Sequence, residues 1–257
     1  MAQPISQIFF KKNLPLLSKK GRDESSLFIV EGEKFAAEIS SEWSISYFIV
    51  SDEFFQEHDL SVYENKASVY IAPDHLYKKL SGTVTPQGVM AVCEKKSFCL
   101  ENVIRDGCLL LLCEQLSDPG NVGALIRTSD AANASGIILT QGSADLYSPK
   151  VIRASAGSVF HIPCVEEADA LYTVRFLKSM GIVIAAAHLK GNVSPYSMNM
   201  RQSCCILIGN EARGLSPEIT EQADILLKLP MNPRAESLNA AAAGSILLYE
   251  AVRQRGL

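Results

Sequence analysis

Three short segments in the second half of the chain combine glycine with side chains that can bind a substrate or move a proton. They are residues 117–127, residues 208–216, and residues 229–231 together with 236–239. Each lies where an apolar, strand-like run ends or where a helix-like run begins. Because open α/β sheets bind ligands beyond the carboxyl ends of their strands, we expect the three segments to form one site.

The first segment contains a helix-initiating turn followed by an arginine. Residues 118–121, Asp-Pro-Gly-Asn, suit a turn because proline presets φ, glycine tolerates positive φ, and Asp or Asn caps the next helix. Arg127 follows about two turns later among apolar residues. A permanent charge in such surroundings is costly unless an anion meets it. The segment therefore indicates either a structural cap or a contact with an anionic group such as a phosphate.

The second segment imitates a phosphate-binding P-loop and fails at the decisive position. Leu215 stands where the P-loop needs a lysine for the β and γ phosphates. No other glycine-rich turn with a downstream acidic residue suggests a dinucleotide site, so an α/β nucleotide hydrolase is not expected. Gly209 would instead let the backbone approach an adenine or ribose, and Glu211 could accept hydrogen bonds or order a neighbouring arginine. In the third segment, Ser237 and Asn239 have the residue types of a helix cap.

In order and spacing, the three segments resemble the motifs of the SpoU (TrmH) family of RNA ribose 2′-O-methyltransferases, within the SPOUT superfamily, from about Gly107 onward. The resemblance implies a trefoil-knotted parallel-sheet α/β fold, S-adenosylmethionine as cofactor, and a homodimer. It makes Arg127 the central catalytic residue, acting as a base or as an electrostatic stabiliser. Asn121 would organise the site.

The resemblance also assigns the remaining site residues. Ser237 and Asn239 would face the reacting ribose, with Glu211 as a further catalytic candidate. Cofactor-binding positions fall on Gly209, Leu229, Met231 and Leu238, and no metal is implied. Ala212 and Pro233 stand where the family usually has glycine, which leaves the shapes of these two loops open. Residues 147–158 also resemble the family and are expected near the substrate, where Lys150 and Arg153 would contact phosphate or simply face solvent.

The elements needed to position this site form two predicted domains. In residues 1–100 the pattern predicts strands at 27–30, 45–50, 68–71 and 88–92 and helices at 34–39, 53–58 and 74–80. Residues 28–32 and 85–92 resemble the ends of a substrate-binding domain that is similar to RNA-binding ribosomal proteins. Residues 94–106 are the expected linker. Residues 107–257 form the methyltransferase domain.

The second predicted domain alternates apolar strands with helices, which favours a parallel sheet covered on both faces. The strands are expected at 108–113, 136–139, 183–187, 205–208 and 225–229, and the helices at 121–133, 171–180 and 216–222. The final helix, 238–253, is apolar nearly all round. A buried helix of this kind is typical of a subunit interface.

Bulk properties restrict the partners. The net charge is −4; residues 1–100 carry 11 basic and 13 acidic side chains, and residues 101–257 carry 13 and 15. A strongly basic nucleic-acid-binding domain is thus excluded, and RNA must contact local clusters such as Lys11–Lys12 and Lys78–Lys79. Seven cysteines without a C-x-x-C pair indicate a reducing compartment. Lacking an apparent signal peptide or membrane span, the protein is expected in the cytoplasm, with RNA rather than DNA as its partner.

The expected activity is methyl transfer to a ribose 2′-hydroxyl of structured RNA, with ribosomal RNA favoured by the N-terminal domain. Transfer RNA is the second candidate substrate. The rival from another class is a non-catalytic RNA-binding or ribosome-assembly protein that retains the fold, which the presence of Asn121 and Arg127 disfavours.

Overall fold

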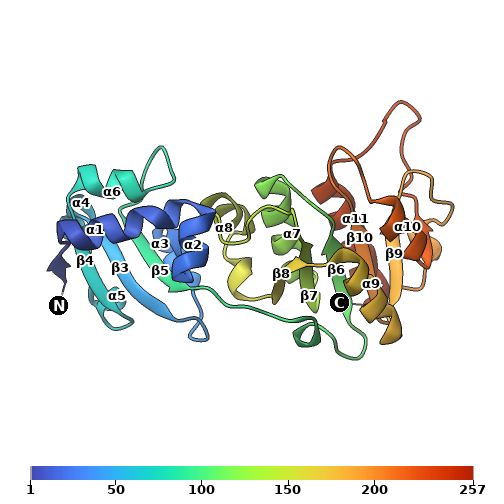
Figure 1. The fold of residues 1–257 in the computed structure, drawn as a ribbon, viewed down its shortest axis with the longest axis horizontal. Helices are drawn as coiled ribbons and strands as arrows, with labels where there is room; N and C mark the ends of the chain where they lie inside the picture. The colour runs from blue at the N-terminus through green and yellow to red at the C-terminus, as the bar shows by residue number, and fades with distance from the viewer. Residues whose placement is uncertain (1, 257) are drawn as a thin grey trace. The chain divides into compact units, whose positions relative to one another are not determined.

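The computed structural model describes residues 2–256, which divide into two compact units (Figure 1). The first contains the chain up to Lys96 together with Tyr147–Phe160. The second contains Ser97–Leu146 and the chain from His161 onward. The first unit therefore takes in a segment from the middle of the sequence, which the position of a single linker does not indicate.

The first unit is built on a five-stranded sheet with the order β1-β4-β3-β5-β2. β1 (Gln3–Pro4), β4 (Ser68–Ala72) and β3 (Ile45–Ser51) are parallel neighbours, whereas β5 (Val89–Glu94) is antiparallel to both β3 and β2 (Leu27–Glu31). All four strands that the sequence pattern predicts in this part are present. Their inward side chains, including Phe28, Phe48 and Met90, are fully buried.

Several short helices surround this sheet. They are α1 (Gln7–Asn13), α2 (Lys19–Ser25), α3 (Glu33–Glu38), α4 (Asp52–Glu57), α5 (Ser61–Glu64), α6 (Asp74–Leu80) and α8 (Pro149–Ser155), with 3₁₀ turns at Leu14–Leu17 and Ser158–Phe160. α1 and α2 were not predicted from the sequence. Each begins at a serine cap: Ser6 accepts a hydrogen bond from the Phe9 amide, and Ser18 from the Gly21 amide.

An aromatic cluster holds the segment 147–160 in the first unit. The rings of Phe28 and Tyr147 lie 4.6 Å apart between centroids, and those of Trp43 and Phe160 lie 5.2 Å apart. The Trp43 indole donates a hydrogen bond to the Phe160 carbonyl at 3.0 Å. Trp43 is buried in this cluster.

The second unit contains six parallel strands with the order β11-β9-β10-β6-β7-β8, which confirms the predicted parallel α/β sheet. The strands are β6 (Leu109–Cys113), β7 (Gly136–Thr140), β8 (Cys164–Ala168), β9 (Val183–Ala187), β10 (Cys204–Ile208) and β11 (Ile225–Leu227). β8 was not predicted. As an edge strand it carries Glu166 and Glu167, which interrupt the apolar pattern of the buried strands.

Helices cover both faces of this sheet (Figure 1). α9 (Ala170–Ser179) and α10 (Pro217–Gln222) pack over one face, and α7 (Pro119–Ala131) and α11 (Ala240–Arg255) over the other. Single 3₁₀ turns lie at Leu100–Asn102 and Pro195–Ser197. None of the helices within residues 2–256 combines the length and the apolar character that a membrane crossing requires.

α7 and α11 lie unusually close together because α11 carries a glycine at their contact. A Cβ atom at Gly244 would lie 2.6 Å from Cδ2 of Leu125. The Thr128 and Ser245 hydroxyls meet at 3.0 Å. This packing fixes the first half of α11 against the second half of α7.

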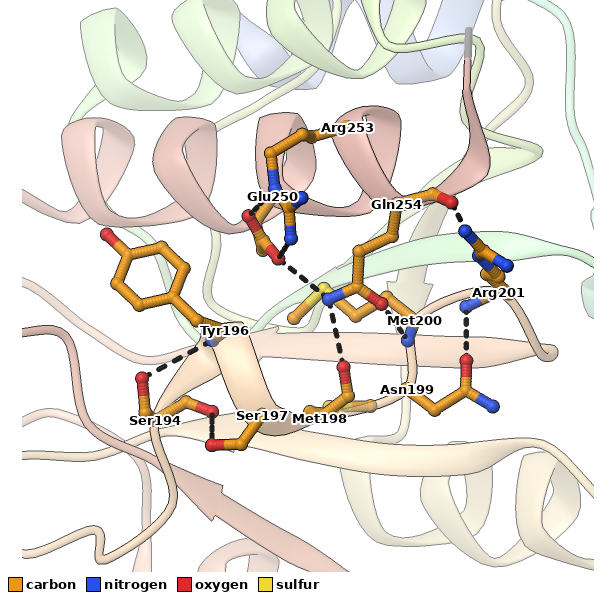
Figure 2. Close-up of polar contacts among 10 residues, drawn as sticks. All are labelled: Ser194, Tyr196, Ser197, Met198, Asn199, Met200, Arg201, Glu250, Arg253 and Gln254. Atoms are coloured by element: carbon orange, nitrogen blue, oxygen red, sulfur yellow. Dashed lines mark hydrogen bonds and ion pairs between the residues drawn. The ribbon is translucent and has the colours of Figure 1, made fainter.

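The last turn of α11 is fastened to the segment 194–201 (Figure 2). The side-chain amide of Gln254 donates to the Met198 carbonyl at 2.9 Å and accepts from the Met200 amide at 2.9 Å. The main-chain carbonyl of Gln254 accepts from Arg201 Nε at 2.7 Å. The buried Glu250 carboxylate accepts hydrogen bonds from the side chains of Arg253 and Gln254. These contacts fix the C-terminal end of the helix whose other end enters the site.

Candidate active site

The three predicted segments follow strands of the same parallel sheet: the first two follow the neighbours β6 and β10, and the third follows β11, which is separated from β10 by β9. β6 and β10 are paired so that Cys113 lies opposite Ile208, and the Glu114 amide continues the ladder to the Ile208 carbonyl at 2.8 Å. The first two segments therefore leave the sheet side by side. The third leaves β11 and returns at the beginning of α11.

Glu211 connects the second segment to the first. Its carboxylate accepts hydrogen bonds from the Ser117 amide at 3.2 Å and hydroxyl at 3.0 Å, from the Asp118 amide at 2.9 Å, and from the Asn121 side chain at 3.0 Å. Partial burial by itself would raise the pKa of Glu211, but these hydrogen bonds outweigh it and lower the pKa to about 2. Glu211 is therefore an anion throughout the neutral range.

Asn121 relays this contact to the third segment. Its side-chain nitrogen donates to Glu211, and its side-chain oxygen accepts from Asn239 at 2.9 Å. Residues of the network also take part in capping the two helices. The Asp118 side chain caps α7 by accepting from the Asn121 amide, and the Asn239 side chain caps α11 by accepting from the Ala242 amide. The structural and functional interpretations of these residues thus coincide, because helix capping holds a side-chain network that joins all three segments.

The loop after β10 is a tight turn closed on itself. Asn210 and Gly214 exchange backbone hydrogen bonds of 3.1 and 2.8 Å. A Cβ atom at Gly209 would lie 2.2 Å from backbone atoms of Gly214 and Leu215. Gly209 is therefore required by the turn itself, a reason that differs from the predicted approach to a ligand. Ala212 does not adopt positive φ, so an alanine fits this loop although the family usually has glycine here.

Two polar residues directly after β6 support this loop and were not singled out from the sequence. The buried carboxylate of Glu114 accepts the Ser216 amide at 2.8 Å. Gln115, which has a φ of 49°, accepts Asn210 at its carbonyl and Arg213 at its side chain, at 2.7 and 2.9 Å. Their position at the end of a buried strand was the available signal.

Arg127 lies in other surroundings than the sequence indicated. Its side chain is exposed on α7, whereas Val122, Leu125 and Ile126 of the same helix are buried. No hydrogen bond or ion pair within residues 2–256 involves its guanidinium, so the structure does not join it to the network. The expectation of apolar surroundings is wrong because the apolar residues of α7 face the sheet and α11. An exposed cation does not require a bound anion.

Lys150 and Arg153 lie on α8, within the first unit. Lys150 is exposed. One terminal nitrogen of Arg153 is buried without a hydrogen-bond partner among the described residues.

The loop between β11 and α11 has the open groups that a nucleoside-like cofactor needs. No backbone hydrogen bond within residues 2–256 uses the amides or carbonyls of Leu229, Met231 or Leu238. Leu229 and Met231 are half-buried, and Leu238 is 39% exposed. Free backbone groups beside apolar side chains fit an adenine and its ribose. Ser237 is exposed beside them.

Pro233 is accommodated by a local turn in this loop. The Asn232 carbonyl accepts the Ala235 amide at 2.9 Å, and the Asn232 side chain accepts the Arg234 amide at 3.0 Å. The departure from glycine at Pro233 therefore coincides with a compact turn that leaves Leu229 and Leu238 accessible.

Comparison with known proteins shows which family the chain resembles. Residues 108–249 match the model of the SpoU rRNA Methylase family, and residues 10–91 match the MRM3-like substrate binding domain. The 23S rRNA (guanosine(2553)-2′-O)-methyltransferase RlmP of Bacillus subtilis is 32% identical over 235 residues, which cover 91% of this chain and 92% of the relative.

Solved structures resemble the whole chain as well. The SpoU methyltransferase AviRb from Streptomyces viridochromogenes in complex with AdoMet has a TM-score of 0.88 at 28% identity, covering 97% of this chain and 98% of that one. The AdoMet-bound rRNA methyltransferase from Sinorhizobium meliloti has a TM-score of 0.86 at 30% identity, covering 98% and 97%.

The family and the S-adenosylmethionine-dependent methyltransferase class predicted from the three segments are thereby confirmed. The matches extend over both predicted parts of the sequence, so the likeness is not confined to the site. The chain belongs to the SpoU rRNA Methylase family.

Proposed function

We propose that this protein transfers a methyl group from S-adenosylmethionine to a ribose 2′-hydroxyl of ribosomal RNA. The observation that carries the proposal is the Glu211–Asn121–Asn239 network, which joins the three family segments at the carboxyl edge of the parallel sheet. The ribosomal substrate is favoured because RlmP of Bacillus subtilis, similar along nearly its whole length, is named as a 23S rRNA 2′-O-methyltransferase.

Leu229, Met231 and Leu238 would hold the cofactor through their open backbone groups and apolar side chains. S-adenosylmethionine supplies an electrophilic methyl group when it is bound. The contribution of the protein is then to place the ribose oxygen in line with that methyl group, and such positioning accounts for much of the acceleration in displacement reactions.

Within the network we assign Asn121 and Asn239 to positioning the ribose, together with Ser237, which is exposed two residues before Asn239 in the chain. Glu211 is a positioning residue rather than a base, because its hydrogen bonds lower its pKa to about 2 and a carboxylate of this kind holds protons weakly. Its role is to fix the Asn121 side chain and the amides of the first segment.

Arg127 would act electrostatically. Guanidinium groups stay protonated in proteins, which argues against a role as general base. Because Arg127 is exposed and has no partner within residues 2–256, it is available to a phosphate or to the oxygen that loses its proton. The ribose 2′-hydroxyl would lose its proton to solvent or to the neighbouring phosphate as its oxygen receives the methyl group.

The wider arrangement follows the same proposal. Residues 1–100 would recognise RNA and residues 107–257 would carry the transfer, with residues 229–239 wrapped through a loop to form the trefoil knot that the resemblance implies. A homodimer is supported by the apolar side chains that α11 leaves exposed, Ile246 at 41% and Tyr249 at 52%. The seven cysteines are all free and six are buried, which supports a cytoplasmic location.

The proposal is tested by incubating the full chain with methyl-labelled S-adenosylmethionine and protein-free ribosomal RNA, followed by nuclease digestion. We expect label on a ribose 2′-oxygen, and Asn121→Ala should abolish it. Label on a base, or transfer only to transfer RNA, would contradict the proposed function. Light scattering at micromolar concentration tests the dimer separately.

A further inference from the structure

A hollow in the first unit is lined by residues of α4, of α6 and of the stretch before β5. None of the residues that line it belongs to the three segments described above, which are part of the second unit. The hollow encloses about 230 Å³. We propose that this hollow binds one unpaired RNA base that carries an exocyclic amino group. The inference rests on the proposed function in one respect, namely that the substrate is RNA.

The size of the hollow suits a single ring system. Sites for drug-sized molecules enclose roughly 300–1,000 Å³, so this volume is too small for a whole nucleotide with its phosphate. Gly88 forms part of the wall with a φ of 80°, and a Cβ there would lie 2.7 Å from Cβ of Phe54. The chain thus passes directly against Phe54 and gives the hollow a fixed side.

One of the side chains that line the hollow carries a buried polar atom without a partner among the described residues. Tyr77 lines the hollow and is 1% exposed, and its hydroxyl has no hydrogen-bond partner among the described residues. Burial raises the pKa of Tyr77, so this hydroxyl stays protonated and can donate as well as accept. An unsatisfied buried hydroxyl is costly, and a base with its ring of donors and acceptors would satisfy it.

An aromatic platform stands at the mouth of the hollow. The rings of Phe54 and His58 are stacked 4.0 Å apart with an interplanar angle of 2°. Phe54 is buried and His58 is exposed, so His58 is the member of this pair that solvent and a ligand can reach. Unpaired bases commonly stack on such faces, because every base has a π-surface.

The charges in the wall select which base fits. Three carboxylates, Glu53, Glu57 and Asp74, face a single cation, Lys78. Asp74 accepts the Glu53 amide at 3.3 Å, whereas the exposed carboxylate of Glu57 makes no hydrogen bond or ion pair within residues 2–256. An acidic wall repels phosphate and accepts hydrogen bonds from amino groups, as carboxylates do from cytosine N4. Cytosine is therefore preferred over uracil, which presents a carbonyl oxygen at the same position.

The test measures binding of fluorescein-labelled octamers of cytidine and of uridine to the full chain by fluorescence anisotropy. We expect the cytidine octamer to bind at least about fivefold more tightly. The two octamers carry the same charge, and their bases differ at the position where cytosine has an amino group and uracil a carbonyl oxygen. His58→Ala should weaken cytidine binding about tenfold, the scale of one lost base stack. Glu57→Gln should remove the preference for cytidine.

Glu42→Gln is the matched control, since Glu42 is an exposed acid of the same unit outside the hollow. Tyr77→Phe adds a readout that a purely structural role would not give: it should leave thermal stability unchanged or higher, because it removes the orphan hydroxyl, and still weaken cytidine binding. Equal affinities for the two octamers, or hollow variants that behave like Glu42→Gln, would overturn the inference.

The same preparations are titrated with S-adenosylhomocysteine by calorimetry, so that the two proposals fail in different ways. Retained cofactor binding with no octamer preference removes only the base site. Absence of cofactor binding contradicts the proposed function, whereas the octamer comparison still decides the base site on its own.

Discussion

Replacing Glu211 by glutamine should destabilise the protein by about 1–2 kcal/mol at neutral pH. The carboxylate accepts four hydrogen bonds through its two oxygens, from Ser117, Asp118 and Asn121. A glutamine offers one accepting oxygen and turns an NH₂ group toward the other donors. The lowering of the Glu211 pKa from its ordinary 4.5 to about 2 corresponds to about 3.4 kcal/mol without screening, which exposure of the side chain to solvent reduces to the range above.

The direction of the pH dependence follows from the same shift. Because the pKa of Glu211 is lower in the folded than in the unfolded chain, its contribution is complete above about pH 4.5 and is lost as the pH falls toward 2. Urea unfolding of the wild type and of Glu211→Gln, from pH 7 downward, should show a stability difference that shrinks below pH 4.5. Glu221→Gln, at an exposed acid, is the control. A difference equal to that of the control, or one that does not change with pH, would refute the reasoning.

The remaining predictions concern the cofactor loop, the arginine and the two units. Gly209→Ala should abolish S-adenosylhomocysteine binding in calorimetry, since its Cβ would lie 2.2 Å from the backbone of the same turn; near-normal affinity would show that the turn can relax. Arg127→Ala should lower the single-turnover transfer rate at least ~10²-fold with little change in cofactor affinity, and Arg127→Lys should rescue poorly; an unchanged rate would make Arg127 structural. A chain beginning at Gly107 should be less soluble than the full chain in sedimentation, because Tyr147 and Phe160 lose their aromatic partners. Equal solubility would show that the segment 147–160 is stable alone.

Strongly apolar runs made much of the fold predictable. β6, β9 and β10 are continuous apolar strands, and their parallel pairing follows from the helices between them. β8 was missed because Glu166 and Glu167 interrupt its apolar pattern, and α2 was missed because its sequence contains no apolar side chain that could indicate a buried face. The placement of Tyr147–Phe160 in the first unit depends on contacts with Phe28 and Trp43 that are distant in sequence.

The site was predictable to a similar depth. The resemblance named Asn121, Glu211 and Asn239, and the structure joins them. The structure does not join Arg127 to this network. The position of Arg127 around the helix places its side chain on the exposed side of α7, although its neighbours in the sequence are apolar. Gln115 was not predicted as a site residue because its role depends on a backbone conformation with positive φ, and a glutamine in the sequence does not indicate such a conformation.

The central claim is that the network of the three segments prepares a ribose hydroxyl for methylation. The most direct measurement is mass-spectrometric mapping of 2′-O-methyl groups in ribosomal RNA from cells that lack the gene and from cells complemented with wild type or with Asn121→Ala. The account predicts one ribose methylation that is absent from the deletion, restored by the wild type and not restored by the variant. Restoration by Asn121→Ala, or an unchanged ribose methylation pattern in the deletion, would contradict it.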